Sequence, residues 1–203
     1  MFRPRPSDAD GRLVQGRVQG RARAALRRFR QDQAGAYAVE FALLATPFLA
    51  LLFGIFEVGL GILTAASLET AVANASRQIY TGQFQTSSSN AGQSAAQLAD
   101  KFKTLVCNDV NALFDCQSML KVDVRTFDSF PNASVPSPVT NGQFDSSGFG
   151  YGSAGPDQIV VVRAALEYPV LVPISQFGDL ANGKRVVMAS AAFRTEPYRN
   201  SGN

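Results

Sequence analysis

One long apolar stretch, residues 35–66, constrains the fold of this chain more than any other feature. Its only charged residues are Glu40 and Glu57. An α-helix rises about 1.5 Å per residue, so about 20 such residues cross the hydrocarbon core of a bilayer. We therefore expect a transmembrane helix over residues 36–66. The apolar residues after it recur at helical spacing and predict an amphipathic extension of the same helix over residues 67–80: Leu68, Val72, Ala75 and Ile79.

Basic residues gather on one side of this stretch. The net charge of the chain is +3, but the leader over residues 1–35 carries nine arginines against Asp8, Asp10 and Asp32. Arginine on one flank of an apolar helix keeps that flank in the cytoplasm, so the C-terminal part is expected to be exported. A nucleic-acid-binding arm is the alternative for such a leader. We disfavour it because the leader adjoins an apolar span and has almost no interleaved aromatic residues.

The exported part, residues 81–203, is long enough for one modest domain. Apolar residues at helical spacing predict a short helix over 94–108 after a polar turn. Strands are expected where apolar residues alternate or run continuously, over 119–127, 158–168 and 184–195. Strands joined by short loops favour an antiparallel sheet with the helix packed on one face, which is an α+β fold.

Two details of this domain lead to sharper expectations. In the first strand, Leu120, Val122 and Val124 alternate with polar residues that include Asp123, which predicts a half-buried strand. Residues 128–156 are rich in Ser, Pro, Gly and Asn and are expected to form a long loop. Within it, residues 150–155 spell G-x-G-x-x-G. A nucleotide site needs a strand before these glycines and a helix after them, so we expect a flexible loop instead.

The two cysteines, Cys107 and Cys116, fall in the part expected to be exported. In an oxidising compartment such a pair most often forms a disulfide, here closing a short loop with a stabilisation of about 2–3 kcal/mol. A metal site is not expected, because the chain has no histidine and the cysteines are not arranged as Cys-x-x-Cys. Without histidine, and with scattered acidic residues, we expect neither an enzyme nor a bound cofactor.

The start of the apolar stretch resembles a known processing site. Residues 35–41 read Gly-Ala-Tyr-Ala-Val-Glu-Phe, which is similar to the site in type IV pilin-like proteins where the prepilin peptidase cuts after a glycine. The longer stretch resembles the TadE-like minor pseudopilins of the tight-adherence (Tad or Flp) pilus. That family typically has a Val-Glu-Phe-Ala core, a following proline and a Gly-x-x-Glu-x-Gly element. The matching residues here are Val39, Glu40, Phe41, Ala42, Pro47, Gly54, Glu57 and Gly59. Residues 190–198 resemble the close of the family's C-terminal region.

The resemblance implies cleavage between Gly35 and Ala36, which removes the leader arginines and creates an α-amino group that is protonated at neutral pH. Glu40 would lie one helical turn from this amine and could neutralise it, in its own chain or in a neighbour. The plainer alternative is that Glu40 sits at the headgroup level, where its cost is small. Pro47 removes a backbone hydrogen bond and is expected to kink or loosen the helix. Glu57 is expected near the periplasmic interface, as a helix–helix contact or simply solvated.

We therefore expect a single-pass inner-membrane pseudopilin with a cytoplasmic leader and a periplasmic α+β domain. Its expected partners, implied by the resemblance, are the prepilin peptidase, other pilins and pseudopilins, and the inner-membrane assembly platform. No nucleic acid and no small-molecule substrate are expected. Two alternatives stay open. One is an uncleaved membrane scaffold of the same apparatus, and the other is a secreted protein cut by signal peptidase after Ala66.

Overall fold

The structure is a computed structural model that describes residues 33–110, 114–170 and 179–198. Residues 1–32 of the expected leader lie outside the described residues. The chain divides into two compact units, of which one ends at Phe53 and the other begins at Gly54.

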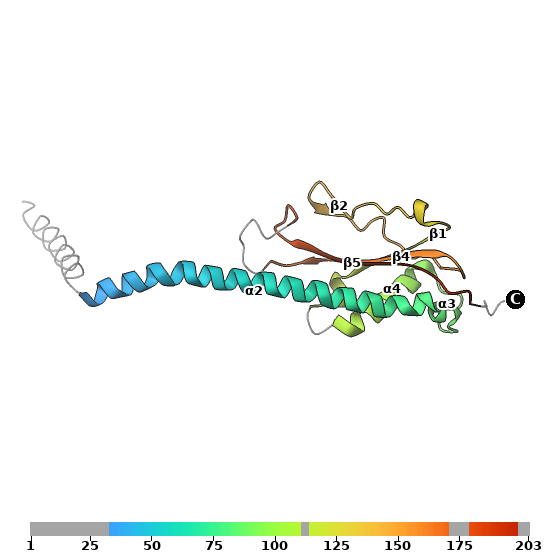
Figure 1. Cartoon of the computed structure of the whole chain (residues 1–203), viewed down its shortest axis with the longest axis horizontal. Helices are drawn as coiled ribbons and strands as arrows, with labels where there is room; N and C mark the ends of the chain where they lie inside the picture. The colour runs from blue at the N-terminus through green and yellow to red at the C-terminus, as the bar shows by residue number, and fades with distance from the viewer. Residues whose placement is uncertain (1–32, 111–113, 171–178, 199–203) are drawn as a thin grey trace, which may run out of the picture. The chain divides into compact units, whose positions relative to one another are not determined.

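The longest element is helix α2, Gln33–Tyr80, which runs from blue to green in Figure 1. The expectation of one long N-terminal helix is thus confirmed. In the part before Gly54 nearly all described side chains are exposed. From Glu57 onward one face of the helix is buried within the second unit. That face comprises Glu57, Gly61, Thr64, Leu68, Ala71, Val72, Ala75, Ser76 and Ile79, and it includes the four apolar residues predicted to share a face.

The second unit contains a three-stranded antiparallel sheet in the order β1-β4-β5 (Figure 1). Its strands are β1 (Lys121–Phe127), β4 (Ile159–Tyr168) and β5 (Arg185–Arg194), each within two residues of its predicted bounds. β4 lies in the centre and nearly every one of its residues is buried. A strand with both faces covered reads as a continuous apolar run rather than an alternation, as Ile159 to Val162 do. The expected α+β class is confirmed.

Short helices complete the core against α2 and the sheet. Helix α4, Ala95–Val110, buries Leu98, Phe102 and Val106 on one face, as its spacing predicted. Two single-turn helices, α3 (Gln83–Thr86) and α5 (Cys116–Met119), were not predicted, because one turn is too short to show a period. Cys107 of α4 and Cys116 of α5 are joined by a disulfide, and both are fully buried.

The segment after β1 has more structure than a loop. It contains the 3-10 helix η1 (Phe130–Asn132) and a small hairpin of β2 (Val139–Thr140) and β3 (Gln143–Phe144). The hairpin turns at Asn141 and Gly142, whose φ angles are 53° and 70°. Asn-Gly is the pair that best tolerates two positive φ angles in a two-residue turn, so this hairpin had a signal in the sequence that the prediction of a plain loop overlooked.

The G-x-G-x-x-G segment is held against the sheet rather than free. The backbone N–H of Val124 donates to the carbonyl of Gly150 at 2.8 Å, and the N–H of Gly152 donates to the carbonyl of Val124 at 2.7 Å. Tyr151 between them is buried. The expectation of a loop is correct, but the expectation of a flexible one is wrong, because these bonds fix it along the outer edge of β1.

Candidate functional site

The residues of the expected processing site all lie in α2. The helix includes Gly35 and Ala36, and the side chains of Ala36, Glu40 and Phe41 are exposed. Ala36 and Glu40 are four residues apart in a helix and so lie on the same side, one turn from each other. Phe41 is 73% exposed and belongs to a run of exposed large apolar residues that extends from Tyr37 to Phe56.

A continuous run of exposed large apolar side chains is rare on a protein surface that faces water. The part of α2 over Gly35–Tyr80 is long and apolar enough to cross a membrane, by length and composition. Pro47 does not end the helix, which continues through it. The hydroxyl of the preceding residue, Thr46, donates to the carbonyl of Ala42 at 2.7 Å, the kind of side-chain bond that helps a proline-containing helix tolerate an apolar environment.

Glu57 differs from the other predicted site residues because its own chain covers it. Its side chain is only 2% exposed, within the second unit. One turn further along the helix, the guanidinium of Arg185 lies so close to Gly61 that a Cβ there would be 2.4 Å from Nη1. A cation from β5 therefore approaches the helix beside the buried acid. Sequence reasoning singled out Gly59, which has open space around it, and missed Gly61, where a side chain would displace Arg185.

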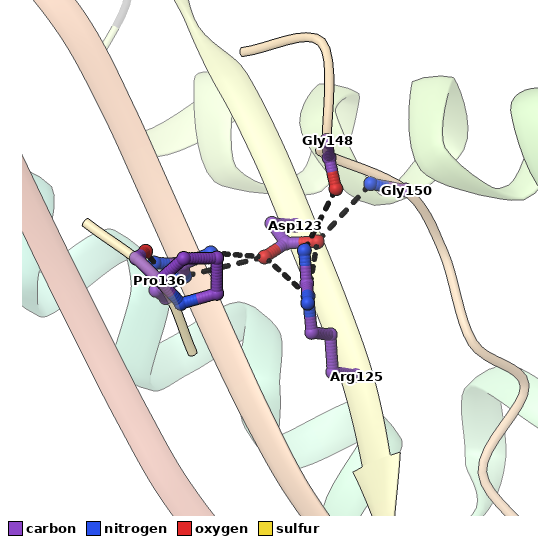
Figure 2. A network of polar contacts seen from close by, with 6 residues as sticks. Asp123, Arg125, Pro136, Gly148 and Gly150 are labelled. Atoms are coloured by element: carbon purple, nitrogen blue, oxygen red, sulfur yellow. Dashed lines mark hydrogen bonds and ion pairs between the residues drawn. The ribbon is translucent and has the colours of Figure 1, made fainter. Parts of the chain in front are cut away.

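A buried ionic network on the sheet was also missed (Figure 2). Asp123 on β1 is 1% exposed, and its register partner on β4 is Arg163, which is also buried. Arg163 donates to Oδ2 of Asp123 from Nη2 at 2.5 Å and from Nε at 3.2 Å. Arg125 donates to the same carboxylate from Nε at 3.0 Å, and the N–H of Gly150 donates to it at 3.1 Å. Both oxygens of the carboxylate therefore accept hydrogen bonds.

The same arginines hold the segment between β1 and β4 on the sheet. Arg163 donates from Nη1 to the carbonyl of Pro136 at 2.5 Å and lies over the ring of Phe149, with 5.2 Å from Cζ to the ring centroid. Arg125 donates from Nη2 to the carbonyl of Gly148 at 2.8 Å. The half-buried alternation predicted for β1 therefore does not hold at Asp123. The segment between β1 and β4 covers the outer face of β1. The carboxylate of Asp123, which the predicted alternation placed among the exposed residues, is therefore buried.

The residues that follow β5 return to the end of α2. The N–H of Glu196 donates to the carbonyl of Tyr80 at 2.9 Å, and the hydroxyl of Tyr198 donates to the carbonyl of Ala154 at 2.6 Å. The ring of Tyr198 lies over Gly82, where a Cβ would be 2.4 Å from two ring carbons. Burial raises the pKa of the Tyr198 hydroxyl, so it stays protonated and keeps this donor role at neutral pH.

Metal ligands do not cluster in the part of the chain that the structure describes, since it holds no group of three or more His, Cys, Asp or Glu side chains suited to an ion. What the described residues do provide is a helix with an exposed apolar part, a buried acid at its junction with the sheet, and a sheet whose outer segment is fixed by paired charges.

Comparison with known proteins bears on the helix. The model of the family described as TadE-like protein matches residues 35–77, which confirms the resemblance over that segment. The match includes Glu40, Pro47, Glu57 and Gly61, and it ends just before the C-terminus of α2. No curated protein and no solved structure matches the chain.

Proposed function

We propose that this chain, whose residues 35–77 match the model of the TadE-like protein family, is a minor pseudopilin of a Tad (Flp) pilus. The observation that supports this best is the change in burial along α2. Large apolar side chains are exposed from Tyr37 to Phe56, whereas from Glu57 one face of the same helix is buried by its own chain. A pilus subunit of this kind needs an exposed apolar part of the helix, which contacts lipid or other helices. It also needs a part of the helix that packs against its own folded domain.

In this proposal the N-terminal residues 1–35 are a cytoplasmic leader, residues 36–66 form the membrane helix, residues 67–80 extend it, and residues 81–203 form the periplasmic domain. The run from Tyr37 to Phe56 is about 20 residues, or about 30 Å of helix, which is close to the thickness of a hydrocarbon core. Since the buried face begins at Glu57, we place the core of the membrane on the residues before it. Residues 57–66, the last part of the membrane helix, then lie at the level of the outer headgroups rather than in the hydrocarbon core.

Processing after Gly35 would change the charge at the helix N-terminus. Cleavage would remove the leader arginines and leave a protonated α-amino group on Ala36, one turn from the exposed Glu40. Within a bundle of apolar helices, pairing this amine with Glu40 of the same or a neighbouring chain would offset the cost of desolvating the carboxylate. The prepilin peptidase, other pilins and the assembly platform are the partners of this mechanism. The role is structural, and we propose no catalytic activity.

The first test is the N-terminus of the protein extracted from the membrane, determined by mass spectrometry. We expect the chain to begin at Ala36, and we expect the Gly35→Ala variant to keep its leader and to migrate more slowly on a gel. Gly59→Ala is the matched control, because Gly59 lies in the same helix with open space around it and should be processed normally.

Other N-termini contradict the proposal in distinct ways. A native chain that begins at Met1 identifies an uncleaved scaffold. A chain that begins at Ser67 identifies a product of signal peptidase. The structure disfavours the second outcome, because a cut after Ala66 would remove Glu57, Gly61 and Thr64 from the face of α2 that is buried against the rest of the unit.

The second test separates the charge of Glu40 from its shape. Glu40→Gln should leave cleavage intact and lower incorporation into the pilus by about tenfold or more, because an amide of the same size cannot neutralise the amine. The measurement is the ratio of assembled to membrane protein by immunoblotting of sheared pili. Glu69→Gln, an exposed glutamate of the same helix, should assemble normally. Normal assembly of Glu40→Gln would remove the pairing mechanism while leaving the processing test unaffected.

A further inference from the structure

Strand β5 forms an open edge of the sheet. It is the last strand in the order β1-β4-β5. The opposite edge is partly closed, because Val124 of β1 bonds to the backbone of Gly150 and Gly152. Natural edge strands are often protected from pairing with another chain by shortness, proline, lysine or a bulge. Between Arg185 and Arg194, β5 has neither a charged residue nor a proline, and its register with β4 is unbroken. Its edge is therefore suited to another strand.

Alternate backbone groups of β5 point away from the sheet. Both backbone groups of Val124 bond outward, so its register partner Val162 directs its own groups toward β5, where it pairs with Ala191. Bonded pairs recur at every second residue of an antiparallel ladder. The N–H and C=O groups of the even-numbered residues from Val186 to Arg194 therefore face away from β4. No described residue bonds to these groups.

The side chains of the same residues lie on the outer face of the sheet and are largely uncovered. Met188 is 44% exposed, and Ser190 and Ala192 are exposed as well. On β4, the register partners of Met188 and Ala192 are Ala165 and Val161, and both are buried. The cover over the outer face of β4 thus stops short of β5. It leaves a strip of small and apolar side chains beside the open edge.

A second copy of this chain does not fit this edge. β5 runs in the same direction as α2, because Arg185 lies beside Gly61 and the ring centroid of Phe193 lies 6.0 Å from that of Tyr80. Two β5 strands paired antiparallel would point their α2 helices in opposite directions, whereas copies in one membrane share an orientation. Paired in parallel about a two-fold axis, they would set amide against amide rather than amide against carbonyl. The β1 edge of another copy is occupied by its own segment 150–152.

We propose that the β5 edge binds an extended segment of a different protein, added antiparallel as a fourth strand. The free backbone groups from Val186 to Arg194 select an extended chain, and the strip that contains Met188 and Ala192 favours apolar side chains at alternate positions. Arg194 favours an acidic residue at the N-terminal end of the partner strand, because its guanidinium is exposed and Nε lies 3.7 Å from the exposed Asp157. That the partner is another pilus subunit rests on the proposed function, whereas the pairing itself does not.

The probe for this edge is a synthetic peptide, Glu-Thr-Val-Thr-Val-Thr-Val-Thr-Val, acetylated and amidated at its ends. Bound antiparallel with its Glu opposite Arg194, it directs its Val amides toward β5 and its Thr amides away. Methylation of the Thr amides should leave binding to the full chain in micelles intact. Methylation of the Val amides should weaken binding about tenfold or more, because it removes the donors to β5. Calorimetric titration measures both affinities. Equal affinities, or no binding of the Thr-methylated peptide, overturns the proposal.

Variants of β5 test whether the peptide binds at this edge. Ser190→Pro removes the central outward N–H and leaves the bonds to β4 in place, so the Thr-methylated peptide should bind about tenfold more weakly. Ser190→Ala, which keeps this N–H, should bind as the wild type does. Met188→Asp keeps the whole backbone, replaces an apolar contact by a charge and should also weaken binding about tenfold.

Three outcomes would overturn the assignment. The first is unchanged affinity in a folded Ser190→Pro protein, and the second is unchanged affinity in Met188→Asp. The third is a wild-type chain that dimerises in micelles while Ser190→Pro stays monomeric, which would identify a second copy as the occupant. None of these measurements requires cleavage after Gly35 or an assembled pilus, so their failure is distinguishable from failure of the proposed function.

Discussion

Replacement of Asp123 by alanine is expected to lower the free energy of unfolding by about 3–5 kcal/mol, because it leaves a buried charge without its partner. Arg163 is only 4% exposed and contacts no second carboxylate among the described residues. Removal of Asp123 therefore leaves a desolvated guanidinium whose other described contacts are the carbonyl of Pro136 and the ring of Phe149. The N–H of Gly150 loses its acceptor at the same time.

Chemical denaturation of the full chain in micelles measures this loss. Asp128→Ala, at an exposed aspartate just beyond β1, should leave the unfolding midpoint unchanged. The double variant Asp123→Leu with Arg163→Met should lose less than Asp123→Ala alone, because it removes both charges and keeps apolar volume between the strands. An Asp123→Ala protein that unfolds at the wild-type midpoint would contradict the ionic account of this sheet.

Asp123→Ala is also expected to change hydrogen exchange locally. Asp123, Arg125 and Arg163 tie the segment that contains Pro136, Gly148 and Gly150 to the sheet (Figure 2). Loss of the carboxylate should therefore speed exchange of the Gly150 and Gly152 amides more than that of amides in the central strand β4. Uniform acceleration across the domain would indicate global destabilisation rather than release of this segment.

Replacement of Gly82 by alanine is the other substitution expected to have a large effect, a loss of about 2–4 kcal/mol. The backbone of Gly82 has φ 75°, a left-handed conformation that side chains other than glycine adopt at a cost. A Cβ there would also come within 2.4 Å of the Tyr198 ring and displace it. With the ring would go the hydrogen bond from the Tyr198 hydroxyl to the carbonyl of Ala154.

Gly92 provides a control that separates these two causes. Its φ is 74°, nearly the same, but no atom lies within 4 Å of the position a Cβ would take. Gly92→Ala should therefore show only the conformational cost, and the difference between the two variants measures the contact with Tyr198. In a Tyr198→Ala background that difference should disappear, as a double-mutant cycle by thermal unfolding would show. Equal losses at Gly82 and Gly92 in the wild-type background would exclude the ring contact.

The elements with strong periodicity were predictable. The apolar run that opens α2, the helical spacing in α4 and the continuous apolar run of β4 each gave the element within a few residues. The single-turn helices α3 and α5 were not predicted, because they are shorter than the windows in which a period is visible. The β2–β3 hairpin was missed although Asn141 and Gly142 signalled its turn.

Sequence alone determined that this chain has a long apolar helix with an acid near its start, followed by an α+β domain, since composition and periodicity are local properties. It did not determine where along α2 burial by its own chain begins. Apart from Glu57 and Thr64, residues 54–66 are apolar or glycine on every side of the helix, so only the packing of the domain decided that Glu57 and Gly61 face inward. Tertiary structure likewise decided that Asp123 is buried, because the segment that covers it and the arginine that pairs with it come from later in the chain, and contacts between distant residues leave no local pattern.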